Sequence, residues 1–104
     1  MTKIIINAGA CGFTITVRAV KGEAGKISVT LETECEAVKK MAEDLAVLDR
    51  FTPLARIQSN PVYVSASKHV KHAACPVPSG ILKAIEVEAG LNVSKDASII
   101  FVKE

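Results

Sequence analysis

The N-terminal third of the chain distributes its apolar residues in the way that β-strands do. Residues 3–9 form a nearly continuous apolar run that ends at a glycine, which predicts a buried strand. Residues 13–20 and 26–32 place apolar, mostly β-branched residues at every second position, so both predict half-buried strands. The connections between these three segments are short and contain glycine. We therefore expect consecutive hairpins that form an antiparallel sheet.

After residue 32 the apolar positions follow a helical period instead. Thr33 and Glu36 have the spacing of a capping box, in which Thr33 is the N-cap and Glu36 reaches back to its backbone amide. The stretch that follows carries a single apolar stripe and charged residues elsewhere, as a helix with one buried face does. We predict this helix over residues 34–49.

Three further elements are expected in the second half of the chain. Asn60 followed by a proline predicts a helix over residues 60–71, although the β-branched residues at 62–64 also suit a short strand. Another helix is predicted over residues 79–89, between a proline-rich segment and a glycine stop. Residues 97–103 predict a last strand, because they are rich in β-branched and aromatic residues.

This order of elements, βββα(α)αβ, predicts an α+β fold. A four-stranded, mostly antiparallel sheet should carry the helices on one face. The chain has 104 residues and shows no internal repeat or linker, so we expect one domain over residues 1–104.

Composition narrows the classes of function. Hydrophobic residues make up 49% of the chain and mean hydropathy is +0.31, which excludes a disordered segment and leaves apolar surface for a homo-oligomer or a protein partner. The formal net charge is +2 and there are four aromatic residues, so a nucleic-acid partner is not expected. No apolar run is long enough for a membrane helix or a signal peptide, so we expect no membrane association and a cytoplasmic location.

Three cysteines, Cys11, Cys35 and Cys75, are the main candidates for chemistry. An odd number of cysteines without an export signal argues against a disulfide framework. If the strands and helices alternate in direction, and if residues 60–71 cross back over the sheet, all three thiols lie at one end of the sheet. The first sits in a turn and the other two at helix starts, where backbone N–H groups favour a thiolate.

Several uses of these thiols remain open. Three thiolates with His72, three residues before Cys75, would complete a tetrahedral zinc site. Three thiolates alone would hold an iron–sulfur cluster with one iron left open. The alternative is a non-catalytic interaction or oligomerisation domain in which the cysteines are small buried hydrophobic residues. No Ser/His/Asp set is present, and only Cys75 with His69 or His72 could form an activated thiolate pair, so the sequence favours a non-enzymatic role.

The segment Cys75-Pro76-Val77-Pro78, followed by Lys83, resembles the Cys-Pro-x-Pro motif of the TusA-like sulfur-relay carriers. In that family the cysteine carries a persulfide and the motif opens a helix. The resemblance covers about 28 residues and implies that Cys75 could act as a sulfur carrier. Lys83 would then stabilise negative charge on the sulfur.

Over nearly its whole length the chain is similar to an uncharacterised family of small three-cysteine proteins from anaerobes. The similarity is carried by four segments: Ala8–Phe13, Cys35, His72–Pro78 and Ile81–Glu86. It implies no particular activity.

Overall fold

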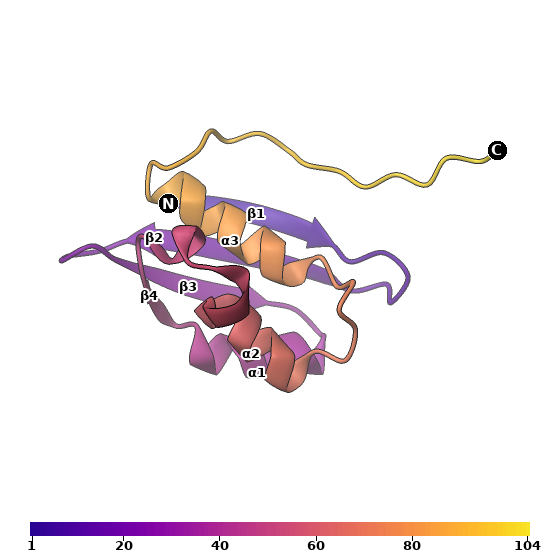
Figure 1. Ribbon diagram of the computed structural model, residues 1–104, viewed down its shortest axis with the longest axis horizontal. Coiled ribbons are helices and arrows are strands. Elements are labelled where there is room, and N and C mark those ends of the chain that lie inside the picture. The colour runs from indigo at the N-terminus through magenta and orange to yellow at the C-terminus, as the bar shows by residue number, and fades with distance from the viewer.

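The computed structural model describes residues 1–104, which form an α+β fold with a four-stranded antiparallel sheet and helices on one of its faces (Figure 1). The elements in chain order are β1 (Thr2–Asn7), β2 (Thr14–Lys21), β3 (Lys26–Glu32), α1 (Glu36–Asp44), β4 (Val47–Asp49), the 3-10 turns η1 (Thr52–Leu54) and η2 (Ile57–Ser59), α2 (Pro61–His69) and α3 (Val77–Glu88). The predicted fold class is therefore confirmed.

The sheet has the strand order β1-β2-β3-β4, with every neighbouring pair antiparallel. Ile4 pairs with Val17 across the first hairpin, and Ala19 pairs with Val29 across the second. Because side chains alternate along a strand, these pairs turn one apolar face of the sheet inward. The predicted hairpin order of the first three strands is correct.

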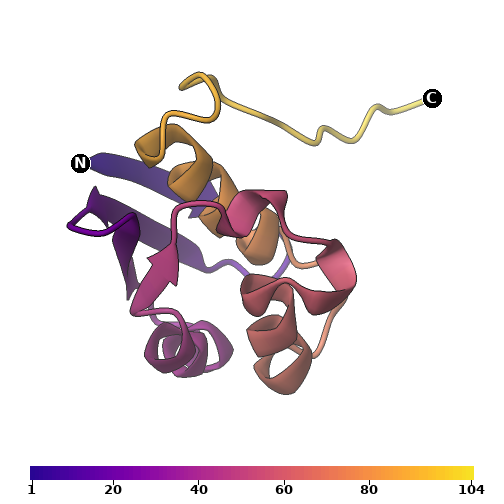
Figure 2. The same cartoon turned by 60° about the vertical axis from the view of Figure 1, so that its left-hand side comes forward.

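All three helices lie on that inward face (Figure 2). Each contributes apolar residues to one continuous core between sheet and helices, which places the fold among two-layer architectures. The buried apolar residues of the core are Ile6, Ile15, Val17, Ala19, Ile27, Val29, Val38, Met41, Leu45, Leu48, Val62, Ala66, Val77, Ile81, Ala84 and Ile85. None of the helices combines the length and the apolar character that crossing a bilayer requires.

The first helix is shorter than predicted, and its cap differs. The N-cap is Cys35, and Thr33 Oγ1 instead accepts a hydrogen bond from the Cys35 backbone N–H at 3.1 Å. The prediction of a capping box is therefore wrong, because the helix begins at Glu36 and not directly after Thr33. The helix also ends at Asp44 rather than at 49, since residues 47–49 extend and pair with β3 as strand β4. That strand buries Leu48 opposite Ile27, so the apolar stripe continues in a strand and not in a helix.

The helix predicted over residues 60–71 is present as α2, and the alternative of a strand at 62–64 is wrong. Asn60 is its N-cap and accepts a hydrogen bond from the Val62 backbone N–H at 3.0 Å. Its side-chain amide also donates to the carbonyl of Thr52 at 2.7 Å. One buried side chain thus fixes both the start of α2 and the loop before it.

The last helix begins at Val77, two residues before the predicted start, because Pro78 is tolerated in its first turn. It runs across β1 and β2 and approaches β1 closely at Gly80. A Cβ atom added to Gly80 would lie 2.8 Å from Ile6 Cγ1. The absence of a side chain at this position allows the helix to lie against the sheet.

The prediction of a last strand over residues 97–103 is wrong. These residues pair with no other strand and extend away from the body of the molecule (Figure 1). The fourth strand of the sheet is β4 instead. β-branched residues favour a strand only where a neighbouring backbone pairs with them, and in the single chain no strand lies alongside this segment.

Candidate functional site

A groove at one end of the sheet is lined by all three cysteines. It lies where β1 ends, β2 begins, α1 and α3 start and α2 finishes, and it has a volume of about 680 Å³. We call it the cysteine groove; its walls include Cys11, Cys35, Cys75, His69, His72, Phe13, Val38, Val70 and Pro76. Ten of its 14 lining residues are hydrophobic, so an occupant would meet thiols in largely apolar surroundings.

Cys11 comes from the turn between β1 and β2. Gly9 and Gly12 on either side of it have φ angles of +85° and +77°, which residues with a side chain rarely adopt. The turn is closed by hydrogen bonds from Gly12 N to Gly9 O at 2.9 Å and from Ala8 N to Phe13 O at 3.0 Å. Cys11 is exposed at the tip of this turn, so it is the most accessible of the three thiols.

Cys35 and Cys75 are half-buried and lie just before helices. Cys35 is the N-cap of α1, where its backbone N–H donates to Thr33. Cys75 ends a turn in which its N–H donates to the carbonyl of His72 at 3.1 Å. Three segments that are distant in sequence therefore each bring one cysteine to the same groove.

Two histidines also line the groove, and they differ in their surroundings. His69 Nε2 lies 3.2 Å from Asp44 Oδ2, and the same oxygen accepts a hydrogen bond from Ser65 Oγ at 2.7 Å. These contacts, the Ser65 hydrogen bond first and His69 second, lower the pKa of Asp44 below its ordinary value. His72 is exposed at the rim. The sequence predicted His72 as a metal ligand. In the structure, the histidine that is oriented by a side-chain contact is His69, through Asp44.

The side chains as they stand do not form a finished metal centre. No group of three or more histidine, cysteine, aspartate or glutamate side chains is arranged so that it could hold a metal ion. The three thiols share one groove without meeting at one point. Binding a metal there would need the groove walls to move inward or an occupant wide enough to bridge the thiols.

The surroundings of Cys75 differ from those that the sulfur-carrier motif implies. Lys83 is exposed on α3 and is not part of the groove wall. Because α3 starts at Val77, the N–H of Gly80 is bonded to the Pro76 carbonyl at 3.0 Å. Only the first helical amides remain near Cys75, and Pro78 contributes none.

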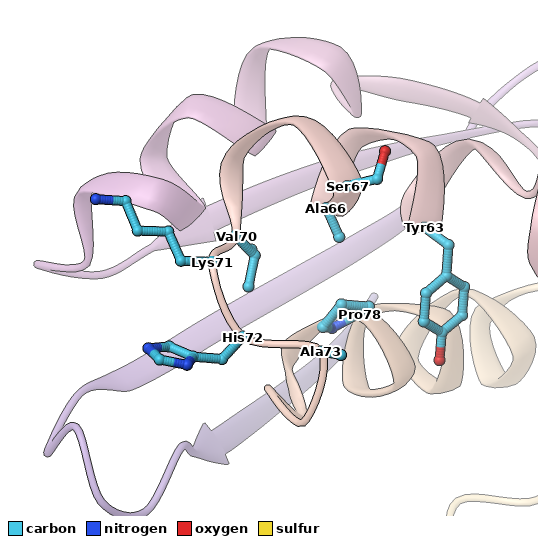
Figure 3. Close-up of a pocket in the computed structure, with 8 residues that line it drawn as sticks. All are labelled: Tyr63, Ala66, Ser67, Val70, Lys71, His72, Ala73 and Pro78. Atoms are coloured by element: carbon cyan, nitrogen blue, oxygen red, sulfur yellow. The ribbon is translucent and has the colours of Figure 1, made fainter.

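A smaller hollow of about 480 Å³ adjoins the cysteine groove between α2 and α3. Figure 3 shows His72 and Tyr63 at its opposite ends, with Pro78 and Ala73 between them. Val70, Lys71 and His72 line both hollows. The two cavities therefore meet at the segment that follows α2.

Comparison with known proteins identifies a family and no function. No curated protein and no solved structure matches the chain. A family profile matches residues 2–101, a range that contains all three cysteines and both histidines. This match supports membership of an uncharacterised family, and it supports neither the three-cysteine motif nor the sulfur-carrier resemblance. The chain belongs to the family of unknown function DUF6951.

Proposed function

We propose that this protein binds an iron–sulfur cluster in the cysteine groove, with Cys11, Cys35 and Cys75 as the ligands. The observation that carries the proposal is the shared groove. A turn, a helix cap and an interhelical loop each deliver a thiol to one apolar cavity. Packed structural cysteines need not share a cavity, and one of these three, Cys11, is exposed.

The arrangement of the three thiols, which share a groove without forming a ready set of ligands for one ion, favours a cluster over a single ion. Zinc bonds of about 2.3 Å would require the three sulfurs to lie within roughly 4 Å of one another. No such set exists in the structure as it stands. A cluster supplies its own bridging sulfides and is several ångströms wide, so thiolates that do not meet at one point can reach its separate irons.

Cluster binding also agrees with the character of the walls. Each thiol would lose its proton as its sulfur–iron bond forms, and the apolar lining would keep water from the cluster. The turn that carries Cys11 lies at the groove mouth and is exposed, so it can close over an occupant without disturbing the core. His72 at the rim is the fourth ligand available to an iron that the thiolates leave open.

The test is reconstitution without oxygen, using ferrous iron and sulfide. We expect visible charge-transfer absorption and iron that co-purifies with the full chain. Cys11→Ser, Cys35→Ser and Cys75→Ser should each lose most of the bound iron. Lys71→Gln, at an exposed position that also lines the groove, should retain the cluster and serves as the control.

Two outcomes would argue for other functions. Stoichiometric zinc with no colour would mean that the groove closes around one ion. Uptake of sulfur by Cys75 from a persulfide donor, with no iron retained, would support a sulfur carrier instead. Either result would overturn the cluster proposal.

A further inference from the structure

The C-terminal segment leaves a run of apolar side chains in solvent. Residues 97–103, here called the tail strand, include Ile99, Ile100, Phe101 and Val102, whose exposed fractions are 88%, 75%, 99% and 80%. All residues from 90 to 104 are exposed. Consecutive exposed apolar residues of high β propensity usually mark a segment that pairs with another strand.

An open sheet edge of matching length is present in the same fold. The strand order places β1 at the edge of the sheet, so one side of its six residues has no backbone partner. Helix α3 packs on the face of β1 and leaves this edge uncovered (Figure 1). Ile5 of β1 is 66% exposed on the opposite face. A long open edge with an apolar residue beside it can accept a further strand.

The tail leaves the molecule beside that edge. Glu88, at the end of α3, accepts hydrogen bonds from Thr2 Oγ1 at 2.7 Å and from Lys21 N at 2.8 Å. These contacts fix the end of α3 against the start of β1. The residues between the helix and the tail strand, 90–96, are mostly polar and can span up to about 25 Å when extended.

From these observations we infer that the tail strand adds to the β1 edge of a second copy of this chain, and that the second copy returns its own tail strand. The donor strand and the acceptor edge lie on the same chain, so two copies satisfy both at once with two-fold symmetry. Within one chain the tail strand stays off its own edge and projects beyond the body (Figures 1 and 2). A second copy is therefore the occupant that uses both features.

The alternation of the tail strand suits this position. Ile99 and Phe101 would share one face of the added strand, and Ile100 and Val102 the other. On β1, Ile4 lies toward the core and Ile5 toward solvent. Either orientation of the added strand thus gives it apolar neighbours on both faces. Each sheet of the dimer would then have five strands.

The test is the mass of the protein in reducing buffer, measured by light scattering and sedimentation over a range of concentrations. We expect the full chain to be a dimer and the chain without residues 97–104 to be a monomer. Phe101→Asp should raise the dimer dissociation constant by about 10- to 100-fold, because a buried aromatic side chain is lost. Val93→Asp is the matched control, since Val93 is exposed in the same tail but precedes the tail strand; it should leave the dimer intact.

Hydrogen exchange of the β1 amides locates the contact. In the dimer these amides should be protected, and the protection should disappear in the shortened chain. A full chain that stays monomeric up to about 100 µM would overturn the inference, as would a dimer that persists without the tail strand. A monomer whose β1 amides are protected by the tail at every concentration would show own-chain pairing, which also overturns it.

Discussion

Gly80 sets how closely α3 approaches the sheet. A Cβ atom there would overlap Ile6, one of the buried core residues of β1. The helix itself would gain from alanine by about 1 kcal/mol, but forcing atoms into a packed core costs about 1–3 kcal/mol. This contact could not be predicted from the sequence, because the neighbour of a helical glycine depends on where the helix packs in the fold.

We predict that Gly80→Ala lowers the free energy of unfolding by about 1 kcal/mol despite the better helix propensity. Urea denaturation measures this. Lys83→Ala, at an exposed site of the same helix, should change stability by less than about 0.5 kcal/mol. A more stable Gly80→Ala protein would show that Ile6 yields freely and that the close contact has no role.

Asn60 stabilises both the start of α2 and the loop before it. It is 1% exposed, caps α2 and bonds the Thr52 carbonyl. Asn60→Ala should cost about 2–3 kcal/mol, because it removes a cap and leaves a buried carbonyl without its partner. Asn92→Ala, at an exposed asparagine, should cost almost nothing. Equal urea midpoints for the two variants would contradict this role.

At the scale of elements, the sequence predicted the helices and strands whose formation depends on residues that are close together in the chain. The three N-terminal strands follow from alternation, and the start of α2 follows from Asn60 and Pro61. The predictions were wrong for segments whose structure depends on residues that are distant in the sequence. Residues 47–49 became a strand because they pair with the free edge of β3, whereas residues 97–103 do not lie alongside the open β1 edge of their own chain and stay unpaired.

The end of α3 is tied to the first hairpin through Glu88, and this tie should depend on pH. The backbone N–H of Lys21 and then the Thr2 hydroxyl lower the pKa of Glu88 below its ordinary value of 4.5. A carboxylate with a lowered folded-state pKa stabilises the fold above its unfolded pKa, and this contribution is lost as pH falls through the folded value.

We therefore predict that Glu88→Gln is less stable than the parent protein at pH 7 and that the difference shrinks on acidification below about pH 4.5. Urea midpoints of both proteins at pH 7 and pH 3 measure it. A difference that is the same at both values would mean that the charge of Glu88 does not contribute.

At the scale of the whole molecule, the fold gathers its chemistry at one end and leaves apolar surface elsewhere. The alternating strand and helix directions predicted a shared end for the thiols, and the groove contains all three. The positions of the thiols within the groove could not be predicted from the sequence, because they depend on the conformations of the loops that carry them. The orienting contact between His69 and Asp44 joins two helices and has no local signature.

The central claim is that the cysteine groove holds an iron–sulfur cluster, and the direct measurement is the iron and acid-labile sulfide content of the anaerobically reconstituted protein. We predict both in similar amounts, with at least two irons per chain, and loss of both in Cys35→Ser, whose substitution lies in the half-buried wall of the groove. Iron without sulfide, or a Cys35→Ser protein that keeps the same content as the parent, would contradict the account.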